Sequence, residues 1–289
     1  MANGHTPLDE VLMIIAIGAY VVGALALLVY FFSRSAWLRH LAIPLAIAGC
    51  IAQFGQLFAR YEITHIWPLL NLYGSLSLFA AVAVLIFIIF AFRYDLWFAG
   101  GFVLGLAALF LAYAITWNEG TMPAVPSLQS YWAKIHVPLV VSSYAAFMVS
   151  FVISVLFLVK YYLERSLARR NVSAADSPGL PWLDTMPSLA QLDVLIYRIV
   201  AVGLPLLTLG IITGAMWAHE SWGHYWQWDP KETAALFSWI VYAIYMHLHT
   251  RNAWRGVRTA WVSVIGFLSI MFCYFGVNLW ISGLHSYKV

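Results

Sequence analysis

Histidine and tryptophan are the residues of this sequence whose types could do chemistry. The chain holds 9 His and 14 Trp among 289 residues. Neutral imidazole is the commonest metal ligand in proteins, and haem iron accepts it as an axial ligand. Indole combines a flat apolar face with an N–H donor, which suits a large planar amphiphile such as a porphyrin. These residue types therefore predict a metal or cofactor site, provided that the fold brings them together.

The densest tryptophan cluster lies in residues 217–232. An aromatic belt at a membrane interface explains one or two Trp at a helix end. It does not readily explain four Trp within 12 residues, spaced by Gly223: Trp217, Trp222, Trp226 and Trp228. We expect this segment to form a short platform of indole rings at the membrane surface.

The same segment ends with the pattern of a helix start. Asp229 can cap the helix, Pro230 suits its first position, and Glu232 falls at the third, as in a capping box. The N-terminus of a helix presents backbone N–H groups to anions. It could therefore meet the propionates of a porphyrin that rests on the indole platform.

The composition is that of a membrane protein. Hydrophobic residues make up 63% of the chain and charged residues 9%, against roughly 25% charged in a soluble domain. Together with a mean hydropathy of +0.83, this excludes a soluble globular protein and a disordered chain. The net charge of +3 is too small to argue for nucleic acid. Cys50 and Cys273 each lie in an apolar run, which argues against a disulfide framework, a zinc site or a dithiol motif.

Eight apolar runs are long enough to cross a bilayer, which needs roughly 20 residues per helix. We therefore predict an all-α, polytopic membrane protein, with a single membrane domain over residues 1–289 and a cytoplasmic linker at 164–192. The predicted spans are about 11–32, 41–59, 72–92, 96–116, 137–159, 193–217, 233–250 and 260–282.

The Lys and Arg residues predict the orientation of these spans. One set of loops and span ends holds eleven of them, and the other holds only Arg60, Lys134, Lys231 and Lys288. Cytoplasmic loops carry the excess of positive charge, so the larger set is predicted to be cytoplasmic. Because the number of spans is even, both termini then face outward, as does the segment 217–232.

His136 and His285 differ from the other histidines predicted to be external. Each lies at the outer mouth of a predicted span, whereas His5, His219 and His224 are better explained as solvated loop residues. Two imidazoles at one depth on different helices could ligate one metal from opposite sides. Position alone leaves this hypothesis open beside the plainer one.

Two further histidines, His247 and His249, lie near the inner end of the seventh predicted span. They are two residues apart, so they project roughly 200° apart on a helix and cannot face one site. His247 lies nearer than His249 to the helix face of Glu232. An ionisable side chain inside a span is costly and usually functional, and we prefer His247 as the functional one.

The residues Trp222-Gly223-x-x-Trp226-x-Trp228-Asp229-Pro230-Lys231-Glu232 resemble the WWD signature of the haem-handling protein superfamily. This superfamily includes CcsA/ResC of system II cytochrome c biogenesis and CcmC and CcmF of system I. Three further segments are similar to CcsA or to the superfamily: 128–146 with His136, 273–287 with His285, and 68–76, in which Gly74 replaces the usual acid. The resemblance covers most of residues 60–287.

The resemblance implies a set of site residues. His136 and His285 would ligate the iron of haem b at the outer face, and His247 would ligate a second haem in transit. The other ligand of that second haem would come from a CcsB partner. The outer haem would be positioned by the Trp-rich segment, through Trp217, Trp222, Gly223, Trp226, Trp228, Asp229 and Glu232.

The activity that the resemblance implies is that of a holocytochrome c synthase, a haem lyase acting together with CcsB. Haem would be joined to the two thiols of a CxxCH motif in apocytochrome c, which a thioredoxin-like protein keeps reduced. Because the substrate brings the thiols, no side chain of this chain is needed as a nucleophile, and catalysis is mainly positioning.

Two alternatives remain open. One is a haem exporter or chaperone that forms no thioether bond, like CcmC. The other is a structural membrane subunit whose Trp residues form an aromatic belt. The membrane is expected to be the bacterial inner (plasma) membrane or the thylakoid membrane.

Overall fold

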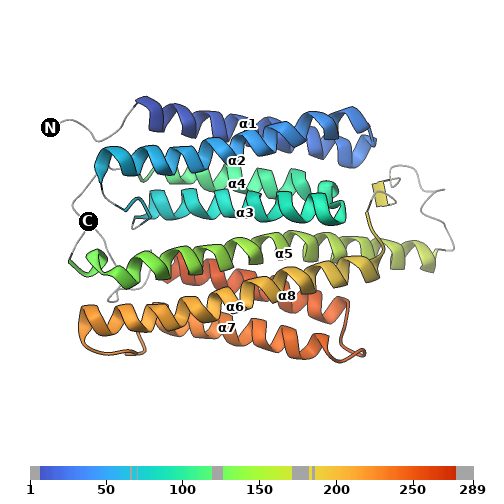
Figure 1. Cartoon of the computed structure of the whole chain (residues 1–289). Coiled ribbons are helices and arrows are strands. Elements are labelled where there is room, and N and C mark those ends of the chain that lie inside the picture. The colour runs from blue at the N-terminus through green and yellow to red at the C-terminus, as the bar shows by residue number, and fades with distance from the viewer. Residues whose placement is uncertain are drawn as a thin grey trace. The chain divides into compact units, whose positions relative to one another are not determined.

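The computed structural model describes residues 7–65, 67–69, 71–118, 126–170, 182–183 and 186–277. Helices are the only regular elements in this part of the chain (Figure 1). The chain divides into two compact units, each described by itself below. Unit 1 comprises Met1–Val125 and Tyr162–Ser188, and unit 2 comprises Pro126–Tyr161 and Leu189–Val289.

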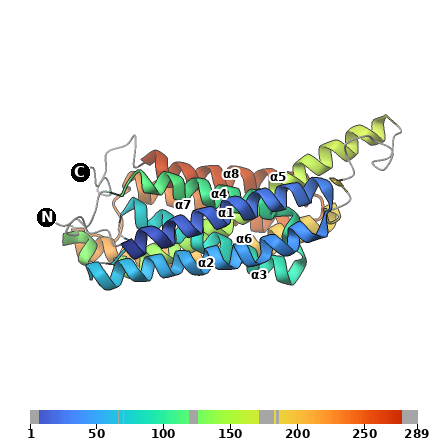
Figure 2. The same ribbon diagram turned by 90° about the horizontal axis from the view of Figure 1, so that it is seen from above.

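Unit 1 is built around four long helices. α1 packs on α2 and α4, and α3 packs on α2 and α4. In Figures 1 and 2 these helices run side by side along their lengths. Their bounds are α1 Pro7–Ser33, α2 Ala36–Thr64, α3 Leu72–Tyr94 and α4 Gly100–Ile115, with the short 3-10 helix η1 at Leu96–Ala99.

Unit 2 carries most of the predicted site residues. α7 packs against α6 and α8 in this unit. The beginning of α5 and the end of α6 lie at the same end of the unit (Figure 1). The elements are η2 Pro126–Gln129, α5 Tyr131–Arg169 (whose last turns belong to unit 1), α6 Leu189–Trp222, α7 Pro230–His249, α8 Val257–Met271 and the π-helix η4 Phe272–Gly276.

The expected all-α polytopic fold is confirmed. Each of the eight predicted spans coincides with helix over its described residues, and residues 278–282 of the last span lie outside them. Seven of the described helices are long and apolar enough to cross a membrane. The described helix that is not among these seven is α7, which has 20 residues and includes Lys231 and Glu232 in its first turn. The expectation of one membrane domain over residues 1–289 stays a prediction.

The predicted linker at 164–192 is shorter than expected within the described residues. α5 continues to Arg169, and α6 begins at Leu189. α6 also continues to Trp222, five residues beyond the end of the predicted sixth span at 217.

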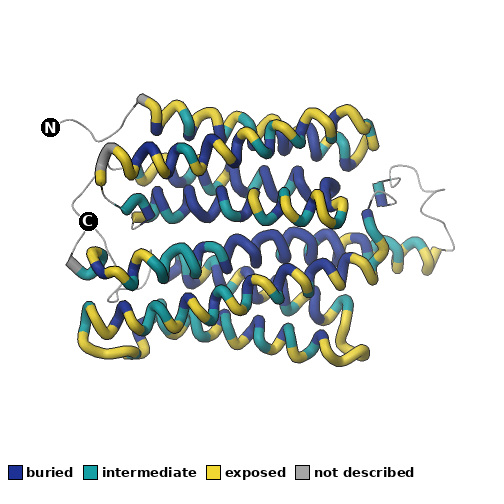
Figure 3. The backbone as a smooth tube through the Cα atoms, viewed as in Figure 1, coloured by how far each residue is buried: buried dark blue, intermediate teal, exposed yellow. Residues whose placement is uncertain are grey.

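The outer faces of the helices are apolar, as lipid requires. Large apolar side chains such as Ile14, Phe58 and Leu109 are 67%, 64% and 65% exposed. Figure 3 shows such exposed positions along α1, α2, α6 and α7. A soluble protein rarely exposes so much contiguous apolar surface, so these faces are the ones that contact lipid.

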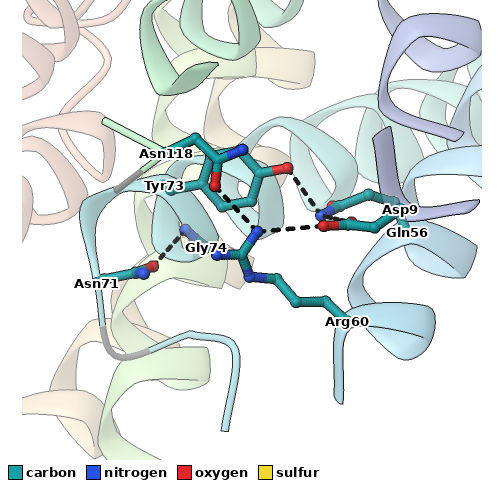
Figure 4. A network of polar contacts seen from close by, with 7 residues as sticks. All are labelled: Asp9, Gln56, Arg60, Asn71, Tyr73, Gly74 and Asn118. Carbon is teal, nitrogen blue, oxygen red and sulfur yellow. Dashed lines mark hydrogen bonds and ion pairs between the residues drawn. The ribbon is translucent and has the colours of Figure 1, made fainter. Parts of the chain in front are cut away.

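A buried polar network ties together the helices of unit 1 at one end (Figure 4). Arg60 Nη1 donates to Asp9 Oδ2 and to Asn118 Oδ1, each at 3.1 Å. Its guanidinium lies 4.4 Å from the centroid of the Tyr73 ring, and Gln56 donates to both Asp9 and Tyr73. The side chains of Asp9 and Arg60 are only 1% and 3% exposed. The network thus joins α1, α2, α3 and the residues that follow α4.

The turn before α3 explains the glycine at position 74. Asn71 caps α3 by accepting a hydrogen bond from Gly74 N at 2.8 Å. A Cβ at position 74 would lie 1.5 Å from the carbonyl oxygen of Pro68. No residue with a side chain, including the acid expected from the resemblance, therefore fits at position 74 on this backbone.

We predict that Arg60→Met lowers the free energy of unfolding by about 3–5 kcal/mol, because it leaves the buried Asp9 carboxylate without its countercharge. The double variant Asp9→Leu/Arg60→Met should lose less, since no charge is then left unpaired. Thermal unfolding of the detergent-solubilised protein measures both. Arg93→Met, at an exposed position, is the matched control and should change little. Equal losses in the Arg60 and Arg93 variants would contradict the prediction.

Candidate functional site

His136 is held in one tautomer by the backbone of α6. Its Nδ1 lies 2.7 Å from the carbonyl oxygen of Gly210. A carbonyl only accepts, so Nδ1 carries a proton, and in the neutral ring Nε2 then carries the lone pair. This is the arrangement found in metal-binding histidines, whose second nitrogen donates to a carbonyl or carboxylate. The half-buried ring is thus held in one orientation against α6.

Two glycines of α6 make this contact possible. A Cβ at Gly214 would lie 2.7 Å from His136 Cε1, and a Cβ at Gly210 would lie 2.6 Å from Val140 Cγ2. Four residues apart, the two glycines share one face of the helix. Small residues at this spacing let transmembrane helices approach closely. Neither glycine was predicted to be a site residue, although the four-residue spacing of small residues is a recognised signal for helix packing.

Trp217 lies beside the His136 ring. Its side chain is buried and connects α6 to the segment before α5. The two ring centroids are 5.6 Å apart at 32°, and Trp222 follows at 5.3 Å from Trp217. Trp217 is 4% exposed, and its Nε1 donates to the carbonyl oxygen of Ser127 at 2.7 Å. Ser130 also donates to Glu220 at 2.7 Å. The end of α6 is thus fastened to the chain that leads into α5.

The loop between α6 and α7 is shorter than the predicted platform, because residues 217–222 are helical. Gly223, with φ of +81°, ends α6 and donates its N–H to the carbonyl oxygen of His219 at 2.9 Å, as a glycine after a helix commonly does. Tyr225 stacks on His219 at 4.2 Å. The loop therefore turns sharply away from the helix axis and presents its rings outward.

Trp226 and Trp228 form the remaining part of the cluster. Their rings meet edge to face at 5.6 Å and 89°, and Trp228 is 68% exposed. Trp228 also has a φ of +58°, a left-handed conformation that is uncommon for a bulky residue and often marks a functional site. The exposed face of the Trp228 indole is therefore accessible to a ligand.

The predicted capping box is present at the start of α7. Asp229 accepts from Lys231 N at 3.0 Å, and Glu232 Oε2 accepts from the backbone N–H groups of Asp229 and Gln227 at 3.2 and 2.8 Å. Asp229 and Glu232 therefore hold the backbone of residues 222–229, which are called the Trp loop below. Their carboxylates accept hydrogen bonds from backbone N–H groups of the loop and of the start of α7.

Behind the loop, a thiol links α5, η4 and α7. Tyr144 donates to Cys273 Sγ at 3.5 Å, and Cys273 in turn lies 3.7 Å from the carbonyl oxygen of Lys231. Burial lowers the pKa of Lys231, against the opposing effect of Cys273 and Asp229. Further along α7, Trp239 Nε1 donates to Thr208 Oγ1 at 2.8 Å. These contacts fix α7 against its neighbours beneath the Trp loop.

The two histidines near the end of α7 occupy opposite environments. His247 is exposed, and His249 is 5% exposed with its Nε2 3.0 Å from Asp193 Oδ2. The structure thus confirms that the two rings do not share a site. Asp193, which lies 56 residues before His249, was not singled out from the sequence.

The structure brings His136 together with Trp217 and the loop at one end of unit 2. His285, predicted as the second ligand of the same metal, lies outside the described residues. Within the described ranges, no group of three or more His, Cys, Asp or Glu is arranged to hold a metal ion. His65, in unit 1, ends α2 in a left-handed conformation and donates its N–H to Tyr61 O.

Comparison with known proteins settles the family. Residues 69–285 match the family described as "Cytochrome C assembly protein". The chain belongs to this family. Members named cytochrome c biogenesis protein CcsA include those of Synechococcus sp. (strain CC9902), 36% identical over 96% of this chain and 97% of the relative, and Chlamydomonas reinhardtii, 35% identical over 86% and 69%.

A solved structure shares the fold of this cytochrome c assembly protein. The cytochrome c haem lyase CcmF superposes with a TM-score of 0.66 over 93% of this chain and 46% of CcmF, at 18% identity. At that identity the likeness concerns the fold alone. The family and the CcsA relatives show a membrane protein of cytochrome c biogenesis, a process in which haem is involved.

We predict that Gly214→Ala lowers the free energy of unfolding by about 1–3 kcal/mol, because the new methyl group overpacks the His136 ring. Thermal unfolding in detergent measures the loss. Gly105→Ala is the matched control, since a Cβ there meets nothing within 4 Å, and it should be neutral or slightly stabilising. A Gly214 variant as stable as the Gly105 variant would show that the ring has room to move.

Proposed function

We propose that this chain is the haem-handling subunit of a cytochrome c synthase. It moves haem b to the outer face of the membrane, holds it with the Trp loop and two external histidines, and supports its attachment to the CxxCH motif of apocytochrome c. The observation that carries the proposal is the contact of His136 Nδ1 with Gly210 O at 2.7 Å, which in the neutral imidazole leaves the lone pair on Nε2.

The residues around His136 fit a haem ligand. Gly214 leaves the space that the imidazole fills, and Trp217 lies against the ring with the rings tilted by 32°. A fixed, neutral imidazole is what haem iron accepts as an axial ligand. In this proposal His285 supplies the opposite ligand. The two histidines together leave no open position on the iron during delivery.

The Trp loop acts by positioning. Trp222, Trp226 and Trp228 present aromatic faces to the ring system, while Asp229 and Glu232 hold the loop's backbone. The haem substrate supplies two vinyl groups, and each thiol adds its S–H across one vinyl double bond to give a thioether. This addition needs no external oxidant or reductant, and a thioredoxin-like protein keeps the thiols reduced beforehand. Correct placement of the vinyl groups against the thiols can contribute a large part of the rate acceleration.

His247 serves a second haem in transit. It lies on the same exposed side of α7 as Phe237, Ile240 and Ile244, which are 56%, 42% and 47% exposed. A solitary imidazole on an apolar, lipid-facing surface is costly unless it finds a partner. We assign that partner to haem iron, with the other axial ligand supplied by a CcsB-type subunit that packs on this face of α7.

The proposed setting is the bacterial inner (plasma) membrane or the thylakoid membrane, with both termini and the Trp loop on the outer or lumenal side. CcsA relatives from a cyanobacterium and from an alga support this choice. The excess of Lys and Arg on the opposite side supports the orientation.

We predict that His136→Ala lowers the haem content of the purified protein, and that added imidazole restores a large part of it, because free imidazole can occupy the vacated axial position. The Soret absorbance per protein measures this. His40→Ala, at an exposed position, should retain the wild-type spectrum. Wild-type haem content in the His136 variant without imidazole would reject the assignment, and a wild-type protein with no Soret band would favour a structural subunit.

The attachment step has its own test. The protein purified with its CcsB-type partner should convert a CxxCH peptide into a covalent haem–peptide product, whereas an SxxSH peptide should remain unlabelled. Covalent product is detected by haem stain after denaturing electrophoresis. Haem binding without any covalent product would instead indicate an exporter or chaperone.

A further inference from the structure

A buried imidazole–carboxylate pair lies two residues beyond His247. His249 and Asp193 are 5% and 8% exposed, and His249 Nε2 lies 3.0 Å from Asp193 Oδ2. An ionised carboxylate only accepts, so the imidazole N–H donates to it. A buried charged group of this kind is costly unless fully bonded, and the remaining contacts of Asp193 show that it is well satisfied.

The second carboxylate oxygen of Asp193 reaches the next helix. Its Oδ1 accepts from Gly256 N at 3.0 Å and from Thr259 Oγ1 at 3.3 Å. Gly256 has a φ of +87° and begins α8, so its N–H is turned toward the carboxylate by a conformation that favours glycine. One carboxylate near the start of α6 therefore joins the end of α7 to the start of α8.

The last turn of α7 is also held through its backbone and by aromatic rings. Arg255 Nε donates to the carbonyl oxygen of His249 at 2.7 Å. The His249 ring stacks on Tyr197 with centroids 4.4 Å apart at 16°, and the Tyr245 ring lies 6.0 Å away at 23°. The imidazole can therefore neither rotate nor withdraw without breaking several contacts.

This cluster determines where His247 points. Residues two apart on a helix project roughly 200° from each other, so anchoring His249 toward the interior directs His247 outward. We propose that His249 and Asp193 are positioning residues that fix the rotation of the last turn of α7 and thereby present His247 to haem iron. The inference rests on the proposed role of His247 as a ligand. In it, His247 binds the iron and His249 holds the helix turn in place.

Ligation by His249 itself does not fit the observed contacts. Its Nε2 is hydrogen-bonded to Asp193, and its ring stacks on Tyr197 and lies near Tyr245. A porphyrin could reach this nitrogen only after the pair and the stack had been broken. His247 is exposed and requires no such rearrangement.

Hydrogen–deuterium exchange on the full-length, haem-free protein tests the anchoring directly. In His249→Ala and Asp193→Asn, the amides of the last turn of α7 should exchange about 10-fold faster, as expected from losing a hydrogen bond to a charged group. His249→Gln keeps an N–H donor for Asp193 and should restore part of the protection. His224→Ala, in an exposed loop of the same unit, is the control and should leave this turn unchanged.

Spectroscopy of the haem-loaded protein, purified with its partner, tests the link to His247. His249→Ala and Asp193→Asn should broaden the low-spin signals and shift the midpoint potential of the transmembrane haem, and added imidazole should correct neither. His247→Ala should instead lose that haem and regain it with imidazole. If His249→Ala does not fold, Asp193→Asn and His249→Gln carry the measurement.

The possible outcomes separate the two claims. Unchanged exchange or an unchanged potential in folded His249 and Asp193 variants would overturn the positioning role and leave the proposed function intact. Rescue of His249→Ala by imidazole would make His249 a ligand and overturn it as well. Wild-type transmembrane haem in His247→Ala would refute the ligand assignment itself, and with it the inference.

Discussion

The close approach of α5 and α6 is the constraint on which the candidate site depends. Helices in lipid gain little from burying apolar surface against each other, so they associate where small residues let their backbones approach. Gly210 and Gly214 provide such a place, and the carbonyl oxygen of Gly210 becomes the acceptor for His136 Nδ1. The packing of the two helices and the orientation of the imidazole are therefore determined by one contact. Bulkier residues at the two glycines would separate the helices and leave the imidazole without a fixed orientation.

The Trp loop is shaped by its backbone more than by its rings. Gly223 and Trp228 both adopt left-handed conformations, and Glu232 collects two backbone N–H groups that would otherwise lie unsatisfied. The buried Trp217 and the exposed Trp228 stand at opposite ends of the cluster, 4% and 68% exposed. Residues 217–232 thus contain two kinds of residue, those that build the loop and those that it exposes.

Periodicity and local signals predicted much of this structure. Long apolar runs gave the eight helices, the spacing of Asp229 and Glu232 gave the capping box, and helix geometry separated His247 from His249. Contacts between distant residues could not be predicted in this way. His136 and Gly210 are 74 residues apart, and Asp193 and His249 are 56 apart; no local pattern indicates which carbonyl or carboxylate an imidazole will meet. The family resemblance predicted roles, but it said nothing of these supporting contacts.

The ion pair in unit 1 also determines how the first two helices lie against each other. Asp9 belongs to α1 and Arg60 to α2, 51 residues later in the chain. A buried charge that loses its partner is strongly destabilising, so sliding one helix along the other is opposed by the separation of the two charges. The hairpin of α1 and α2 is therefore held in one register by charge as well as by packing.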